Sequence, residues 1–166
     1  MKILNIFFLL VILGAIVAKL VTFNELSSNG VTGYSYWCFN WTFNVTKANS
    51  IIVFWKENST TAYVNKLLFF DFIFIIAYTL FLCNLSYNML QQQNRLYLNI
   101  WLRMGIGCIL LAALLNLVQD YFIHMALDLK HTWGFMPFIV CTKWFLVFLG
   151  VVPIIVSGFL KPRQTV

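Results

Sequence analysis

The sequence predicts an all-α integral membrane protein, a four-span transmembrane helix bundle with a small extracytoplasmic β-hairpin in the first loop. Three observations lead to this fold class. Hydrophobic residues make up 61% of the 166 residues and charged residues only 10%, a balance far too apolar for a soluble domain of this size. The apolar residues gather in four runs long enough to cross a bilayer. The first loop between them alternates apolar and polar residues, as a β-strand does.

The four runs define a single membrane domain over residues 1–166. The first run follows Lys2 and also fits a secretory signal peptide, but an uncleaved span is favoured because the run exceeds the usual apolar region of a signal. At the rise of an α-helix, each run is long enough for a span. We expect spans at about 3–22, 66–88, 103–127 and 133–160.

Four spans place both termini on the same side of the membrane. Basic residues flank that side with fewer acidic neighbours than on the opposite side. The positive-inside rule therefore predicts cytoplasmic termini. The same assignment puts the short turn 91–95 in the cytoplasm and the long loop of about 23–65 outside it.

The long first loop carries the strand pattern. Phe39, Trp41 and Phe43 alternate with polar residues, and the turn-like residues 47–50 lead into the run 51–55, which is rich in β-branched and aromatic residues. We therefore predict a hairpin whose aromatic face is Phe39, Trp41 and Phe43. A lone hairpin is marginal in water, so this face should lie on the helix ends or on interfacial lipid. The alternative is an irregular loop with aromatic anchors at the membrane interface.

Polar side chains inside the spans form the candidate site. A charge at the bilayer centre costs about 3 kcal/mol on insertion scales, so such residues usually face the bundle interior and mark a functional site. Asp71, Asp120 and Lys143 fall at similar depth in the outer halves of their spans. Asn116, Asp120 and His124 are four residues apart and so share one helix face. The predicted intramembrane polar cluster is Asp71, Tyr78, Asn116, Gln119, Asp120, His124 and Lys143.

Three interpretations of this cluster stay open. In the first, Lys143 pairs with Asp71 or Asp120 and the network only fixes helix packing. In the second, the aspartate in excess over the one lysine holds a proton or a cation, as in transport relays. In the third, Asp71, Asp120 and His124 hold a metal, or His124 is a general base, oriented by Asp120, that acts on a lipid. A lysine at the same depth repels a metal, so no metal and no catalytic residue are assigned.

The leading expectation for function is an interaction or accessory membrane protein. A proton- or solute-coupled transporter subunit is the second candidate and a membrane-embedded lipid-modifying enzyme the third. The expected partners are membrane lipid and either a second copy of the chain or another membrane protein, and no cofactor is identified. The 11 basic residues are scattered, so nucleic acid is not an expected partner, and the four cysteines form no C-x-x-C pair of the kind thiol redox catalysis needs. An open cavity among the cluster residues would favour transport or catalysis, whereas tight packing would favour the accessory role.

Overall fold

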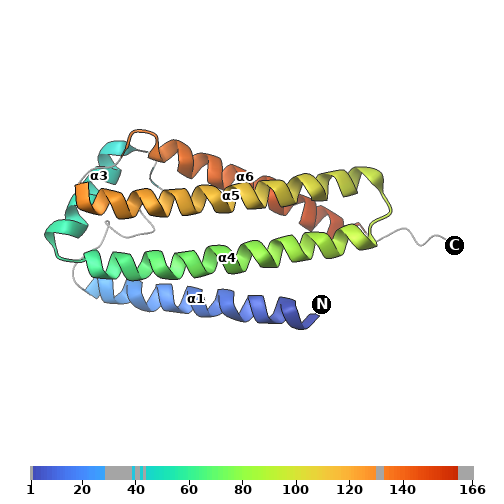
Figure 1. The fold of residues 1–166 in the computed structure, drawn as a ribbon, viewed down its shortest axis with the longest axis horizontal. Helices are drawn as coiled ribbons and strands as arrows, with labels where there is room; N and C mark the ends of the chain where they lie inside the picture. The colour runs from blue at the N-terminus through green and yellow to red at the C-terminus, as the bar shows by residue number, and fades with distance from the viewer. Residues whose placement is uncertain (1, 29–38, 40–41, 43, 130–132, 161–166) are drawn as a thin grey trace.

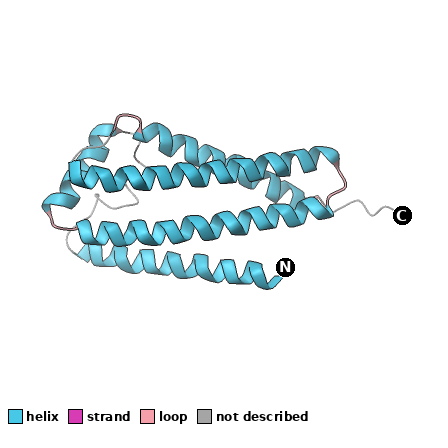
Figure 2. Cartoon of the chain, viewed as in Figure 1, coloured by secondary structure: helices cyan, strands magenta, loops and turns pink. Residues whose placement is uncertain are grey.

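The computed structural model describes residues 2–28, 39, 42, 44–129 and 133–160. These residues are almost entirely helical and contain no strand (Figure 2). Within the described ranges, four helices are long and apolar enough to cross a membrane, which confirms the prediction of four long apolar helices. The helices are α1 (Lys2–Ser28), α3 (Val45–Glu57), α4 (Thr61–Gln92), α5 (Leu96–Leu129) and α6 (Met136–Phe159).

The long helices form an elongated bundle with α3 at one end (Figure 1). α4 and α5 are antiparallel neighbours, α1 packs along α4, and α6 packs mainly along α5. α1 begins and α6 ends toward the end of the bundle that is opposite α3 (Figure 1). α1 is the peripheral member, and little of it is buried against the other helices.

The second and third spans are longer than the apolar runs predict. α4 has 32 residues and α5 has 34, so they are about 48 to 51 Å long, against about 30 Å for the bilayer core. They extend beyond the expected spans 66–88 and 103–127. The flanking residues contain no Gly or Pro, so the helical hydrogen bonding continues beyond the apolar stretch.

The predicted β-hairpin is wrong for the described part of the first loop. Residues 45–57 form the helix α3, and its start is fixed by Asn44. The Asn44 side-chain oxygen accepts hydrogen bonds from the backbone N–H groups of Thr46 at 2.8 Å and Lys47 at 3.4 Å. This is the N-cap arrangement that satisfies the free N–H groups of a first helical turn.

The buried face of α3 explains why the strand prediction failed. Ala48, Ile51, Ile52 and Trp55 are at most 1% exposed, and they recur at the i, i+3, i+4, i+7 spacing of a helix. They pack into one apolar core with residues of α4, α5 and α6. β-propensity depends strongly on context, so burying this helical face outweighs the strand preference of the run 51–55.

Only one member of the predicted aromatic face lies among the described residues. Phe39 is 1% exposed, and its ring centre lies 5.6 Å from that of Trp55. Phe39 therefore packs into the core under α3, as part of the end of the bundle. Trp41 and Phe43 lie outside the described residues.

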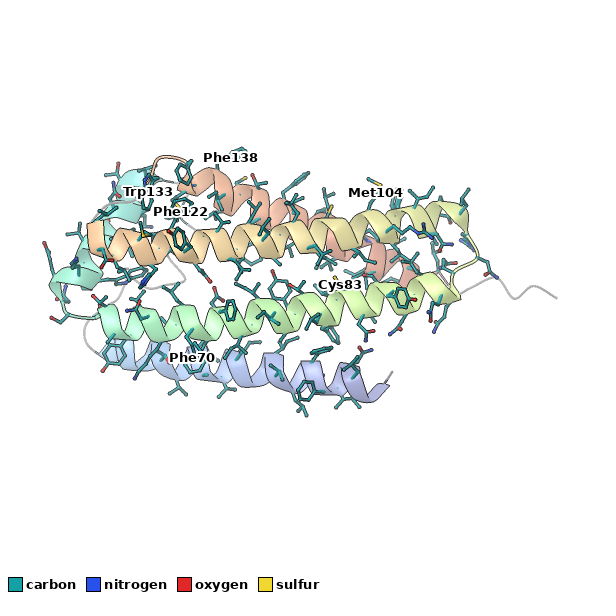
Figure 3. All side chains as sticks on the ribbon, in the orientation of Figure 1. Phe70, Cys83, Met104, Phe122, Trp133 and Phe138 are labelled. Atoms are coloured by element: carbon teal, nitrogen blue, oxygen red, sulfur yellow. The ribbon has the colours of Figure 1, made fainter. Side chains whose placement is uncertain are left out.

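Further aromatic contacts extend this core between α5 and the start of α6. The Phe122 ring lies 4.8 Å from that of Trp133 and 5.0 Å from that of Phe135, both edge to face. Figure 3 shows Phe122 and Trp133 at the α3 end of the bundle and Met104 toward the other end. The end nearest the intramembrane charges is thus built from packed aromatic side chains.

A close crossing of α5 and α6 fixes the register of the two helices. A Cβ atom on Gly150 would lie 2.6 Å from Ile109 Cγ1, and one on Gly105 would lie 3.1 Å from the Gly150 carbonyl oxygen. Small residues at such a crossing let membrane helices approach closely. Lys143 is two turns before Gly150, so the crossing keeps this part of α6 beside α5.

Candidate functional site

An ion pair joins the first and second spans. The Lys19 ammonium of α1 pairs with the Asp71 carboxylate of α4. Asp71 is only 4% exposed, and Lys19 Nζ also lies 5.2 Å from the centre of the Phe74 ring, within reach of a cation–π contact. We expected Lys143 to pair with an aspartate, whereas the structure places Lys19 on Asp71.

Lys143 of α6 is held by neutral groups instead. It is 4% exposed, and its ammonium donates hydrogen bonds to Asn116 Oδ1 at 2.7 Å and to Gln119 Oε1 at 2.6 Å. A lysine ammonium has three N–H donors, so these two bonds leave one more donor. Among the described residues, the hydrogen-bond partners of Lys143 are two side-chain amides.

A cavity of about 320 Å³ lies beside these groups. We call it the charged-ended cavity. Its polar lining contains two lysines and one aspartate, so the lining carries a net charge of one positive. The lining residues, from all four long helices, are Lys19, Asp71, Phe74, Tyr78, Leu82, Asn116, Lys143, Trp144 and Val147.

The charged-ended cavity has a long wall on α4. Its α4 wall runs from Asp71 to Leu82 on one helix face, a distance of about 16 Å at the rise of an α-helix. Spread over that length, a volume of about 320 Å³ leaves a mean cross-section of about 20 Å². Since carbon atoms pack about 4 Å apart, this is the width of one hydrocarbon chain.

The charged and apolar groups occupy different ends of the charged-ended cavity. Asp71 lies nearer the α3 end of the bundle than Leu82, which is three helical turns further along α4. Beyond the charges, the lining includes aromatic and aliphatic side chains of α4 and α6. The arrangement is therefore amphipathic, with a charged end toward α3 and an apolar remainder.

α1 and α6 both contribute to the wall of the charged-ended cavity but do not pack closely on each other. In the part of the chain that the structure describes, α1 packs on α4, and α6 packs mainly on α5. Lys19 of α1 and Trp144 of α6 nevertheless line the same cavity. The cavity wall therefore includes two helices, α1 and α6, that each pack on a different neighbour.

The structure divides the predicted polar cluster between two places. Asp71, Tyr78, Asn116 and Lys143 line the charged-ended cavity, and Gln119 binds Lys143. Two further members of the cluster line a separate, more open hollow between α4 and α5. The residues of this hollow are Asn65, Leu68, Phe72, Leu117, Asp120, Tyr121 and His124.

The second hollow, which we call the His124 hollow, does not favour the metal interpretation. His124 Nδ1 lies 3.3 Å from Asn65 Oδ1, so the histidine contacts an amide. Among the described residues, no three His, Cys, Asp or Glu side chains come together as a metal site requires. Asp71 lines the charged-ended cavity, apart from His124.

Several lining residues were not among the predicted site residues. The sequence does mark Lys19 as a candidate, because it is a further charge inside an apolar run. Its place near the end of that run, however, is also typical of a basic residue that flanks a membrane span. The apolar lining residues could not be identified from the sequence, since every span is rich in aromatic and aliphatic residues. The residues not predicted are Lys19, Phe74, Leu82, Trp144 and Val147.

No protein-family model matches the chain, and no curated protein or solved structure is significantly similar to it. The fold and the site define its class as a small helical bundle with four helices of membrane-spanning character and an amphipathic cavity between them.

Proposed function

We propose that this protein binds a single-chain amphiphile inside its helix bundle, as a carrier or accessory protein of the membrane. The observation that carries the proposal is the charged-ended cavity, about 320 Å³ in volume, with its charged groups toward one end and mostly apolar walls beyond them. Ligand sites are typically about 300 Å³ or larger and mostly apolar, with a few polar groups that fix orientation. The narrow cross-section favours one chain over two.

The seam between α1 and α6 is the proposed route from the bilayer. Both helices contribute to the cavity wall, but each packs on a different neighbour. A chain could therefore enter sideways, between Lys19 of α1 and Trp144 of α6, without separating α4 from α5. With cytoplasmic termini, as the basic residues favour, the charged end would lie in the outer half of the membrane.

A second candidate function is a purely accessory role, in which the polar network specifies helix packing. Its supporting observation is the pair of short hydrogen bonds from Lys143 to Asn116 and Gln119, since satisfied buried networks rigidify a core. The enzymatic interpretation has less support. Its proposed base, His124, lines the His124 hollow rather than the charged-ended cavity.

The test of binding uses tryptophan quenching by brominated amphiphiles in the detergent-solubilised full chain. Bromine on a bound chain should quench the part of the fluorescence that Trp144→Phe removes, because Trp144 lines the charged-ended cavity. Quenching should be saturable at low probe concentration. It should disappear in Val147→Phe, which fills the cavity, and persist in the control Leu149→Phe on an exposed face of the same helix.

Two outcomes would contradict the binding proposal. Non-saturable quenching would mean that the probe only partitions into the micelle. Equal saturable quenching in Val147→Phe and Leu149→Phe would place the probe outside the charged-ended cavity.

A further inference from the structure

We infer that the amphiphile is an anion whose oxygen-bearing head group binds between Lys143 and Lys19. The inference rests on the proposed function, because it specifies the head group of the chain that the charged-ended cavity takes. The chain would run from the two lysines along the apolar walls toward Leu82.

Lys143 carries the argument for an anion. Its ammonium is buried, and its two hydrogen bonds go to neutral amide oxygens. A buried charge is stabilised best by an opposite charge together with hydrogen bonds. One N–H donor remains beyond these two bonds, and Lys143 is part of the cavity wall. The Asp71 and Asp120 carboxylates act on this charge from a distance, and an anionic head group at the remaining donor would add a counter-charge in direct hydrogen-bond contact.

The Asp71 carboxylate already has a cation. Its partner is Lys19 on the neighbouring helix, so the acidic group of this lining is engaged by a basic one. A cationic head group would meet two ammonium groups at this end of the cavity. An uncharged head could accept a hydrogen bond from Lys143 but would add no counter-charge in contact with the ammonium.

The second lysine gives the head group a second cationic neighbour. Lys19 belongs to α1, whereas Lys143 belongs to α6, and both line the charged-ended cavity. A head group placed between them would join the two helices that do not pack closely together. We therefore expect binding of the anion to hold α1 more firmly against the bundle.

The experiment compares three brominated single-chain probes of equal chain length: a carboxylate, an alcohol and an amine. Binding is read from the saturable quenching of the Trp144 signal at a pH where the carboxylate is ionised. The carboxylate should bind at least about tenfold more tightly than the alcohol, because only the carboxylate adds a negative charge next to the two ammonium groups. The amine should bind more weakly than either.

Three variants assign this preference to Lys143. Lys143→Met should bring the carboxylate to the affinity of the alcohol, because it weakens carboxylate binding more than alcohol binding. Asn116→Asp places a carboxylate on the hydrogen-bond partner of Lys143 at the same size, so it should abolish the preference without leaving a cavity in the core. The control Lys66→Met removes an exposed charge of α4, whose ammonium lies over the Tyr63 ring, and should keep the preference.

The outcomes separate the inference from the proposed function. Equal affinities for carboxylate and alcohol, with saturable quenching by both, would contradict the inference that the head group is an anion. The proposal that the cavity binds an amphiphile would still stand. Loss of the preference in Lys66→Met as well would assign it to surface charge and overturn the Lys143 site. An absence of saturable quenching by all three probes would overturn both.

Discussion

Single residues inside the bundle show two different ways of stabilising an ammonium that is buried or partly buried. Lys19 is compensated by the Asp71 carboxylate on the adjacent helix, whereas Lys143 is solvated by the amides of Asn116 and Gln119. In the first arrangement a carboxylate contacts the ammonium directly, whereas in the second the hydrogen-bond acceptors are neutral. The two lysines should therefore respond differently when a neighbour is changed.

The ion pair predicts strong coupling between Lys19 and Asp71. Removing one partner of a buried pair leaves an uncompensated charge and typically costs about 3 to 5 kcal/mol, whereas removing both costs less. We expect Asp71→Asn and Lys19→Met each to lower the Tm in detergent more than the double variant does. A double-mutant cycle on thermal unfolding measures this coupling.

Lys143 provides the comparison for that cycle. Lys143→Met combined with Asp71→Asn should be closer to additive, because the structure gives the Asp71 ion pair to Lys19 and amide partners to Lys143. Additivity in the Lys19 cycle together with strong coupling in the Lys143 cycle would show that Asp71 pairs with Lys143 instead.

Among the elements, α3 shows how burial selects between two secondary structures. As a strand, the run 51–55 would put Ile51, Val53 and Trp55 on one face and Ile52 on the other. As a helix, it buries Ile51, Ile52 and Trp55 together, and Val53 is only partly buried. The helix places three large apolar side chains in one core, and the Asn44 cap satisfies its first turn.

The helix and the strand differ in which substitution, at Ile52 or at Val53, should destabilise the protein more. Ile52 is 0% exposed, so Ile52→Ala should destabilise the protein by about 2 to 5 kcal/mol, as is usual for a buried Ile→Ala change. Val53→Ala should cost less than half as much. Denaturant unfolding in a mild detergent measures both. A larger effect at Val53 than at Ile52 would favour the strand.

On the scale of the whole molecule, the bundle is asymmetric from end to end. α3 and a packed aromatic core occupy one end, and the short turn between α4 and α5 lies at the other (Figure 1). The charged groups of the cavity lie nearer the α3 end. The orientation of the bundle in the membrane therefore decides which leaflet the charged end faces.

The orientation can be read from two exposed positions at opposite ends of the bundle, Glu57 at the end of α3 and Gln92 at the end of α4. In a background with the four native cysteines replaced by alanine, Glu57→Cys should react with an impermeant maleimide in intact cells. Gln92→Cys should react only after permeabilisation, because the positive-inside rule places its turn in the cytoplasm. The reverse pattern would put the charged end in the inner half of the membrane.

The sequence by itself determined the four long helices and the presence of polar groups within them. A span must satisfy its own backbone hydrogen bonds and present an apolar surface to lipid, so each span is marked by its local composition. The cost of an intramembrane charge is also local, which is why Asp71 and Lys143 could be identified as site candidates.

The tertiary structure alone decided which of these groups meet. The partner of Asp71 depends on how α1 and α4 pack and rotate, and composition does not constrain that rotation. The apolar walls, such as Leu82 and Val147, differ from lipid-facing residues only in the neighbours they face. α3 likewise required its packing partners, since the core under Trp55 stabilises a helix where local β-propensity favours a strand.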